Sequence, residues 1–548
     1  LLVEDADGRG GEQEVDHATF GGAGTTAAYE ANDGAVIEPG TFPTAKVVGG
    51  YDFVGDDYNY SGGSTTPAPD PDPLDCEGHG SHVAGTAAGF GVNADGSTYT
   101  GPYTSAAVQA AGLRIGPGSA PRASLMAYRV FGCEGDVSND IVIAAIDRAV
   151  ADGADVINMS LGGSYGRTTD VDAVTVDNAA KAGVMMVISA GNDGHAPYIV
   201  GGPSTANRAL SVAAMDANES FGGADIAVGS THVTAINANA GPLPVNATLD
   251  VITDPTQANG ISLGCDAADY AGTAGKVVVV SRGTCARVDR ATLGDAAGAA
   301  AVIMVNNDAG LPPFEGDIAG VDIPFLGVGQ GDGATLLALD GEAADITGIA
   351  IANPTFAQPI GFTSGGPRSG DAGVKPDVSA PGVSIFSAAV GTGSGGIVES
   401  GTSMAAPHTA GIAALVAQKH PSWSPNLVKA ALVNTASSNP AKLTTDIRVA
   451  GNGLVQPEAA LATSLLMYSG GGETGVSFGV QELDGGFVGT DTLTLRNTGN
   501  RPVRVALSTA FEGDAHGASM SVWPSSVVVP PGTRKVLVTL KMSKAAVA

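Results

Sequence analysis

The segment GTSMAAPH at residues 401–408 places a serine where an apolar helix begins. After Ser403, small and apolar side chains recur at helical spacing: Ala406, Ala410, Ile412, Ala413, Leu415 and Val416. A serine at a helix N-terminus lies beside unpaired backbone N–H groups and the positive end of the helix dipole. Such a setting stabilises the oxyanion that forms when a nucleophile attacks a carbonyl. We therefore interpret Ser403 as a candidate nucleophile, with a helix-capping serine as the structural alternative.

Two further segments carry the groups that such a nucleophile needs. His79 lies in DCEGHGSHVAGT at residues 75–86, where the flanking glycines let backbone approach the ring closely. His82, one helical turn further on, is predicted to be packed and structural. Asn192 lies in VISAGNDG at residues 187–194, and its side-chain N–H is a candidate oxyanion donor. Asparagine in a glycine-rich loop also forms turns, and this is the alternative role for Asn192.

These three segments, in this order along the chain, resemble the histidine, oxyanion and nucleophile motifs of the subtilisin-like serine proteases. The resemblance implies a serine endopeptidase in which His79 is the general base, Ser403 the nucleophile and Asn192 the oxyanion donor. It also implies that two short backbone segments flank the pocket for the substrate residue before the scissile bond. These expected substrate-binding residues are Ser160, Leu161, Gly162, Ser189, Ala190 and Gly191.

The aspartate of the family's catalytic triad has no clear counterpart. The family places it at the end of a first strand, upstream of the histidine, in a pattern of two apolar residues, Asp, Thr or Ser, and Gly. DHATFGG at residues 16–22 resembles what closely follows that aspartate, but residues 8–15 are polar and glycine-rich. Asp5, which follows the apolar residues 1–3, is the best candidate and Asp7 the next, although Asp5 lies further upstream than the family spacing.

Two outcomes follow for this acid. In one, Asp5 ends a short strand and reaches the ring of His79. In the other, which we expect, no carboxylate reaches His79, because the start of the chain is truncated or wrongly joined; the chain begins with Leu and not Met. The alternative function is then a catalytically impaired relic that kept the fold and acts as a binding or scaffold protein.

A second serine provides another alternative. GGSYG at residues 162–166 matches the G-x-S-x-G pattern of the α/β-hydrolases, with Ser164 as the nucleophile of an esterase. That pattern requires a sharp turn directly into a helix, whereas polar residues 167–170 follow here. We therefore favour Ser403 over Ser164.

Composition agrees with a large exported enzyme. At 548 residues the chain is several times the usual length of one domain, so two to four domains are expected, and 43% hydrophobic residues suffice for a core. The net charge of −29 argues against nucleic acid and anionic membranes as partners, since both require basic surface. No apolar run is long enough for a membrane span and no signal peptide is visible. We expect a secreted monomer that acts on proteins or peptides, with its export signal removed or not included.

No cofactor is expected, because no metal motif stands out. Structural calcium is common in the family, but the acidic segment DPDP at residues 70–73 is predicted to be a solvated loop.

Four cysteines allow three pairings. Cys76 lies close to His79 and Cys133 follows a strand-like run, while Cys265 and Cys285 bracket a single predicted strand. We favour Cys76 with Cys133 and Cys265 with Cys285, because each bond then stays within one module. Four free thiols in a cytosolic protein are the alternative. The even count in two local pairs indicates an oxidising compartment.

The elements that must position these residues alternate between strands and helices. Strands are predicted at residues 123–130, 155–158 and 184–188, and helices at 171–181 and after Ser138. The helix after Ser138 is indicated by Ile141, Val142, Ala145, Ile146 and Ala149. Alternation of this kind predicts an α/β fold with a doubly wound parallel sheet covered by helices on both faces. Functional loops then lie at the carboxyl ends of the strands, as Asn192 does.

Changes in composition and in hydrophobic pattern along the chain predict four segments. Residues 1–226 and 354–467 form the two parts of the catalytic domain. Residues 227–353 form a small inserted α/β domain that resembles a protease-associated domain, either docking substrates or covering the cleft passively. Its resemblance rests on GKVVVVSRGTC at 275–285 and AGAAAVI at 297–303, with a helix predicted at 287–299 and strands at 275–281 and 300–306.

Residues 468–548 alternate strand patterns at 491–497, 503–508 and 534–541 with turns. They predict a β-sandwich that resembles a fibronectin-like domain. The chain ends soon after the last strand, which leaves the completeness of this domain open.

Overall fold

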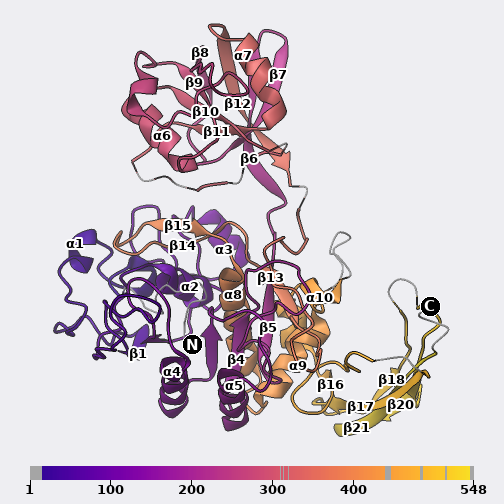
Figure 1. Ribbon diagram of the computed structural model, residues 1–548. Helices are drawn as coiled ribbons and strands as arrows, with labels where there is room; N and C mark the ends of the chain where they lie inside the picture. The colour runs from indigo at the N-terminus through magenta and orange to yellow at the C-terminus, as the bar shows by residue number, and fades with distance from the viewer. Residues whose placement is uncertain are drawn as a thin grey trace. The chain divides into compact units, whose positions relative to one another are not determined.

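The computed structural model describes residues 15–308, 310–312, 314–316, 318, 320–353, 355–437, 446–481, 485–511 and 515–543. The chain forms two compact units, one of Leu1–Ala217 with Ala357–Ala548 and one of Asn218–Phe356 (Figure 1). The inserted domain predicted at residues 227–353 lies within the second unit.

The first unit is built around a parallel sheet of four strands in the order β13-β5-β4-β3. These strands are Val156–Met159 (β3), Met185–Ser189 (β4), Leu210–Met215 (β5) and Val378–Pro381 (β13). Every residue of β3, β4 and β5 is buried, as expected for strands covered on both faces. Two further strands, Val47–Asp52 (β1) and Leu125–Arg129 (β2), pair in parallel with each other.

Helices cover both faces of this sheet, because alternate strand residues belong to two different cores. Val187 packs with the residues of α2 (His79–Ala88) and α8 (Thr402–Lys419). Its neighbours Met186 and Ile188 pack with those of α4 (Asn139–Ala151) and α5 (Val171–Ala182). The α/β class predicted from the sequence is therefore confirmed.

Small residues bring α2 and α8 close together. A Cβ atom on Gly411 would lie only 2.6 Å from the carbonyl oxygen of Ala87, so a larger residue in α8 would push the two helices apart. Ala87 and Gly411 each lie eight residues after His79 and Ser403 respectively. His79 is the first residue of α2 and Ser403 the second of α8, so each of these two packed helices carries one candidate catalytic side chain at its start.

A buried charge cluster ties the start of β13 to helix α9 (Pro425–Thr435). Lys375 Nζ lies 2.7 Å and Lys429 Nζ 3.4 Å from the carboxylate of Asp377. Both lysines also donate to the carbonyl oxygen of Ala209, which directly precedes β5. Three buried charges are thus shared between the sheet and the helix.

The remaining elements of this part of the first unit are short. They are η1 (Ala18–Phe20), α1 (Thr26–Tyr29), α3 (Ser105–Ala110), β14 (Ile385–Ala388), β15 (Gly396–Glu399), α10 (Ile447–Ala450) and α11 (Pro457–Ala462).

The second unit is a closed barrel of seven strands in the order β10-β11-β7-β6-β12-β8-β9. The strands are β6 (Ser220–Val228), β7 (Thr231–Asn237), β8 (Val245–Val251), β9 (Val277–Ser281), β10 (Ala301–Val305), β11 (Phe325–Val328) and β12 (Ala343–Ala352). The helical elements are η2 (Ala267–Tyr270), α6 (Arg287–Ala296), η3 (Gln330–Asp332) and α7 (Gly333–Ala338). The strands predicted at 275–281 and 300–306 and the helix predicted at 287–299 correspond to β9, β10 and α6.

The last part of the first unit is antiparallel. One sheet has the order β16-β17-β21-β19 and the other pairs β18 with β20. The strands are β16 (Leu465–Tyr468), β17 (Phe487–Asn497), β18 (Val503–Ala506), β19 (Ser519–Trp523), β20 (Ser526–Val529) and β21 (Gly532–Met542). The boundary predicted before residue 468 falls within β16, whose Leu466 belongs to the core around α8. No helix in the described ranges is both long and apolar enough for a membrane span.

Candidate active site

Ser403 is the second residue of α8 and is only 2% exposed. Its Oγ has no hydrogen-bond partner among the described residues. Pro407, four residues later, lacks the N–H that would normally bond to the carbonyl of Ser403. Ser160 Oγ donates to that carbonyl instead, at 2.7 Å. The proline thus frees an acceptor at the nucleophile, and a side chain from the end of β3 uses it to fix the helix start.

Asn192 follows β4 and is locked to the first turn of α8. Its Oδ1 accepts hydrogen bonds from the backbone N–H and from Oγ1 of Thr402, both at 2.9 Å. Because a backbone N–H only donates, the Asn192 oxygen must face Thr402, which leaves Nδ2 facing the other way. A Cβ atom on Gly401 would lie 3.5 Å from Asn192 Nδ2, 3.5 Å from Ser403 N and 3.6 Å from Ser403 Cβ. Two N–H donors and the serine therefore border one space that the absent side chain of Gly401 leaves open.

His79 is the first residue of α2 and is 8% exposed. The preceding Gly78 has a φ of 120°, a conformation that favours glycine. The buried carboxylate of Asp75 accepts hydrogen bonds from the N–H groups of Glu77, Gly78 and Ser81 at 2.7–2.9 Å. Asp75 thus holds the first turn of α2 and the loop before it. His82 is fully buried in the same helix, and burial lowers its pKa to about 4, as expected for a packed, neutral histidine.

The predicted substrate-binding segments lie at the carboxyl ends of neighbouring strands. Ser160, Leu161 and Gly162 follow β3, while Ser189 ends β4 and precedes Ala190 and Gly191. The N–H of Gly191 donates to Thr402 Oγ1 at 3.2 Å, and the carbonyl of Gly191 accepts from Ser364 N at 2.8 Å. The structure therefore brings Ser160, Gly191 and Asn192 to the start of α8. Thr402 was missed by the sequence analysis, although a hydroxyl residue directly before the nucleophile was visible in the motif.

Ser164 has a different environment. It is exposed, and its Oγ donates to the carboxylate of Asp193 at 2.6 Å and not to a histidine. The next helix, α5, begins only at Val171. The strained strand-to-helix turn that an esterase nucleophile needs is thus lacking at Ser164. Asp5 and Asp7, the candidates for the triad acid, lie outside the described residues.

The prediction that residues 70–73 form a solvated loop is wrong for Asp72. This side chain is only 3% exposed, and burial raises its pKa to about 7, helped by the nearby carboxylates of Asp70 and Glu38. Among the described residues, one trio of His, Cys, Asp or Glu brings possible ligand atoms within 4.8 Å of one another. It consists of Asp56 and the sulfurs of Cys76 and Cys133, which are bonded to each other and so are not thiolate ligands.

Both predicted disulfides form. Cys76 pairs with Cys133 across 57 residues of sequence, and Cys265 pairs with Cys285 across 20. The first bond lies in the loop before His79 and the second in the inserted unit.

A doubly wound α/β unit, with a buried serine at a helix start and two N–H donors around one space, is the arrangement of a serine hydrolase. The sequence profile of the subtilase family (peptidase S8) matches residues 46–453, and the chain belongs to this family. It is 35% identical over 404 residues to the minor extracellular protease Vpr of Bacillus subtilis, covering 71% of this chain and 45% of that protein. It is 32% identical over 403 residues to the subtilisin-like protease SBT1.7 of Arabidopsis thaliana, covering 66% and 49%.

The chain thus spans about half the length of the curated relatives that it matches. Among solved structures, the subtilisin-like protease Apa1 of Pseudoalteromonas sp. AS-11 matches with 22% identity and a TM-score of 0.37, over 76% of this chain and 92% of that one.

Proposed function

We propose that this chain is a secreted serine endopeptidase that hydrolyses peptide bonds in protein or peptide substrates. The observation that carries the proposal is the space beside Gly401, bordered by Ser403 and by two N–H donors. Membership of the subtilase family supports the reaction class. The similarity to an extracellular protease and the two disulfides support export. The proposal includes a monomeric protein and a reaction without a cofactor.

The proposed chemistry uses three residues. His79 takes the proton of Ser403 Oγ as this oxygen attacks the peptide carbonyl carbon. The carbonyl oxygen becomes an oxyanion and accepts hydrogen bonds from Asn192 Nδ2 and from the backbone N–H of Ser403, two nitrogens that border one space beside Gly401. His79 then gives its proton to the leaving amine, and water, deprotonated by His79, releases the acyl group from Ser403.

The substrate segment before the scissile bond would lie between two backbone segments. Residues 160–162 and 189–191 extend from neighbouring parallel strands, and both are hydrogen-bonded to the first residues of α8. The spacing between the paired strands β3 and β4 would therefore determine the width of the proposed pocket. The start of α8 would form its floor.

The other parts of the chain receive proposed identities from their resemblance. The barrel of residues 218–356 acts as a protease-associated domain, and the antiparallel sheets from residue 465 onward act as a fibronectin-like domain. The proposal for the barrel is supported by the pairing of β9 with β10, since these strands carry parts of the two segments on which that resemblance rests.

Labelling with a fluorophosphonate, followed by peptide mapping, tests the proposal. The probe reacts only with a serine oxygen that a neighbouring base activates. We expect covalent label on Ser403 and none on the matched variant Ser403→Ala. Label on Ser164 would support an esterase instead. A folded protein that takes no label on either serine would support the impaired relic, for which the missing Asp-Thr/Ser-Gly pattern is the motivation.

A further inference from the structure

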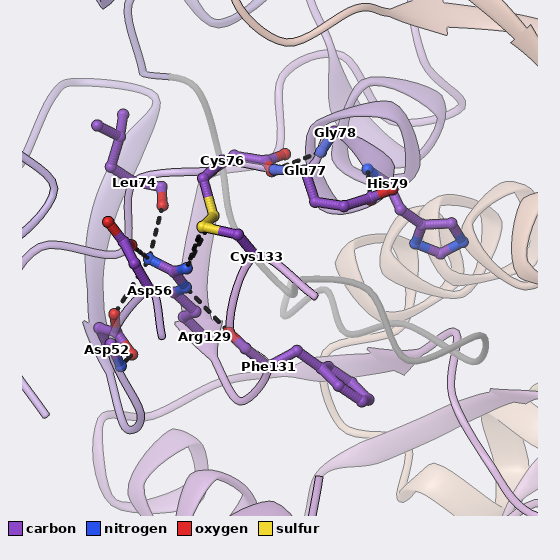
Figure 2. The surroundings of a disulfide bond; sticks show 12 residues. Asp52, Asp56, Leu74, Cys76, Glu77, Gly78, His79, Arg129, Phe131 and Cys133 are labelled. Atoms are coloured by element: carbon purple, nitrogen blue, oxygen red, sulfur yellow. Dashed lines mark hydrogen bonds and ion pairs between the residues drawn. A yellow bond between two sulfur atoms is a disulfide. The ribbon is translucent and has the colours of Figure 1, made fainter. Parts of the chain in front are cut away.

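The guanidinium of Arg129 lies against the disulfide that precedes His79. Arg129 ends β2 and is fully buried. Its Nη2 lies 2.9 Å from Cys76 Sγ and 3.5 Å from Cys133 Sγ, and its Nε donates to the carbonyl of Phe131 at 3.0 Å (Figure 2). One planar side chain thus contacts both halves of the disulfide and the strand end from which it comes.

The same guanidinium reaches three acceptors on the other side. Nη1 lies 2.6 Å from the carboxylate of Asp56 and 3.3 Å from that of Asp52, the β1 residue that pairs with Arg129. It also donates to the carbonyl of Leu74 at 3.4 Å. Arginine presents its N–H groups in a fixed fork, so these contacts hold the guanidinium plane in one orientation. Arg129 therefore joins the ends of β1 and β2 to the chain at residues 74–76.

The segment at residues 74–76 is followed closely by His79, the proposed general base. Cys76 lies three residues before His79, and the intervening loop is fixed at its other end by Asp75. Figure 2 shows the His79 ring pointing away from the disulfide, so the sulfurs support its backbone and take no part in the reaction. The hydrogen bond to Leu74 is long, near the limit for such bonds, whereas the disulfide ties this loop covalently to the segment that follows β2.

We propose that Arg129 and the Cys76–Cys133 disulfide are positioning groups for His79, and that reduction of this disulfide slows the chemical step at Ser403. The reductant is a dithiol. It gives two electrons and two protons to the disulfide, which becomes two thiols, while the dithiol becomes a cyclic disulfide. The inference rests on the proposed function and adds to it a redox-sensitive support.

The size of the effect follows from geometry. A misplacement of about 1 Å in a catalytic group costs about 10²-fold in rate, without a comparable loss of substrate binding. Asp75 still caps α2 after reduction, so the helix persists and the displacement of His79 stays small. We therefore expect kcat to fall by about 10- to 100-fold while KM changes little.

The chain supplies a matched control in its second disulfide. Cys265–Cys285 is partly exposed, like Cys76–Cys133, so one reductant reaches both bonds. It also contacts a fully buried arginine, since Arg290 Nη2 lies 3.8 Å from Cys265 Sγ. It belongs to the inserted unit, whereas the residues of the proposed site belong to the first unit.

The experiment measures the rate of fluorophosphonate labelling at Ser403 and, with a peptide substrate, kcat and KM. In the first arm, folded wild-type protein is reduced in place with dithiothreitol, so that this arm needs no variant that folds without its disulfide. We expect the rate to fall on reduction, and to recover on reoxidation. The paired variant Cys76→Ser/Cys133→Ser should be slow and insensitive to dithiothreitol, while Cys265→Ser/Cys285→Ser should respond like the wild type.

Arg129→Lys adds a separate arm, because lysine keeps the charge beside Asp52 and Asp56 but not the fork that reaches the sulfurs. We expect Arg129→Lys to lower kcat and leave KM unchanged when both are measured at a temperature well below the Tm of the variant. A wild-type rate in both Arg129→Lys and Cys76→Ser/Cys133→Ser would overturn the inference.

Hydrogen exchange separates this inference from the proposed function. If wild-type Ser403 takes no label, the proposed function fails, and exchange of the amides at residues 74–81 still tests the anchor. Faster exchange there on reduction, with β4 unaffected, supports the anchor. Unchanged exchange at residues 74–81 on reduction would reject it.

Discussion

The backbone carbonyl of Ser403 accepts a hydrogen bond from Ser160, because Pro407 has no N–H to donate to it. Oγ, the only polar atom of the Ser403 side chain, has no hydrogen-bond partner among the described residues. Ser403→Ala should therefore cost little stability, since it breaks no hydrogen bond of the described residues. It should lower turnover by about 10⁶-fold if a carboxylate completes the triad, and by only about 10²-fold if none does, because the members of a triad act as a unit. Peptidase assays and thermal unfolding of the purified variant check both points. Retention of a tenth of the activity would refute the assignment.

Asn192 has two roles that one variant would remove together. Loss of Nδ2 in Asn192→Ala should lower kcat by about 10²–10³-fold with little change in KM, as for other oxyanion donors. Loss of Oδ1 uncaps Thr402 N and should cost about 1 kcal/mol of stability. Thr402→Val separates the two, because it removes only the hydroxyl contacts to Asn192 and Gly191. If Thr402→Val lowers kcat as much as Asn192→Ala, then Asn192 acts by holding the helix and not as a donor.

The identity of the triad acid gives a prediction for Asp5. We expect no carboxylate to serve His79, so Asp5→Asn should leave turnover unchanged, as should the control Asp7→Asn. Without such a carboxylate the wild-type chain should be about 10⁴-fold slower than an enzyme with a complete triad, because the acid of a triad fixes the imidazole tautomer and stabilises the imidazolium. Its activity should also be confined to more alkaline pH. Peptidase rates of the three proteins across pH measure this. A fall of about 10⁴-fold in Asp5→Asn alone would identify Asp5 as the acid.

At the scale of single residues, motifs in the sequence predict the candidate site residues. The sequence does not predict which polar side chains are buried. Ser403, His79 and Asn192 could be proposed as site residues because each stands in a segment whose neighbours limit its role. The burial of Asp72 could not be predicted, because it comes from the packing of residues far apart in the sequence, and DPDP reads as a turn. The contact of Ser160 with Ser403 joins residues 243 positions apart, so no local pattern indicates it.

Among the elements, the link between β13 and α9 depends on one carboxylate. Burial raises the pKa of Asp377, but Lys375 and Lys429 outweigh it and leave the pKa below its usual 3.8. Asp377→Asn would leave two buried lysines without their counter-charge and should cost about 3–5 kcal/mol in the free energy of unfolding. The control is Asp446→Asn, whose partly exposed pair with Arg448 should contribute less than about 1 kcal/mol. Urea unfolding at pH 7 compares them.

The pH dependence of that cluster has a definite sign. Because the folded pKa of Asp377 lies below the unfolded value, its contribution to stability is present above pH 3.8 and is lost as the pH falls through the folded pKa. Burial also lowers the pKa of Lys375, to about 8, so this group makes the fold more stable as the pH rises from about 8 toward 10.5. Equal losses of stability in Asp377→Asn and in Asp446→Asn would contradict the role given to the cluster.

The strands and helices of the first unit could be predicted because their hydrophobic periods differ clearly. The helix after Ser138 and the strand at 184–188 were located to within about two residues. Strand β19 was not predicted, although SMSVW alternates serine with apolar residues as a half-buried strand does; its pairing with β21 provides the strand's hydrogen bonds. Its neighbour β20 follows within three residues, which is too short a separation to show as a turn in the sequence pattern.

For the whole molecule, the two points of the first unit between which residues 218–356 are inserted lie next to each other. The N–H of Ala357 donates to the carbonyl of Asp216 at 2.7 Å, and the N–H of Asp216 donates to the carbonyl of Gln358 at 3.1 Å. The chain therefore leaves and returns at adjacent points, and a short linker closes the gap with little loss of entropy. Replacing residues 218–356 by a short glycine linker should shift Tm by no more than about 4 °C.

That shortened protein also distinguishes the two roles considered for the insertion. If the barrel docks substrates, cleavage of a folded protein substrate should fall in the shortened protein while cleavage of a short peptide stays the same. If the barrel only covers the cleft, both rates should stay the same or rise, because nothing that binds substrate has been removed. Fluorophosphonate labelling of Ser403 provides the control, since the small probe needs the site and no docking surface. Loss of labelling together with loss of the thermal transition would show that the first unit depends on the insertion to fold, contrary to the adjacency of residues 216 and 357.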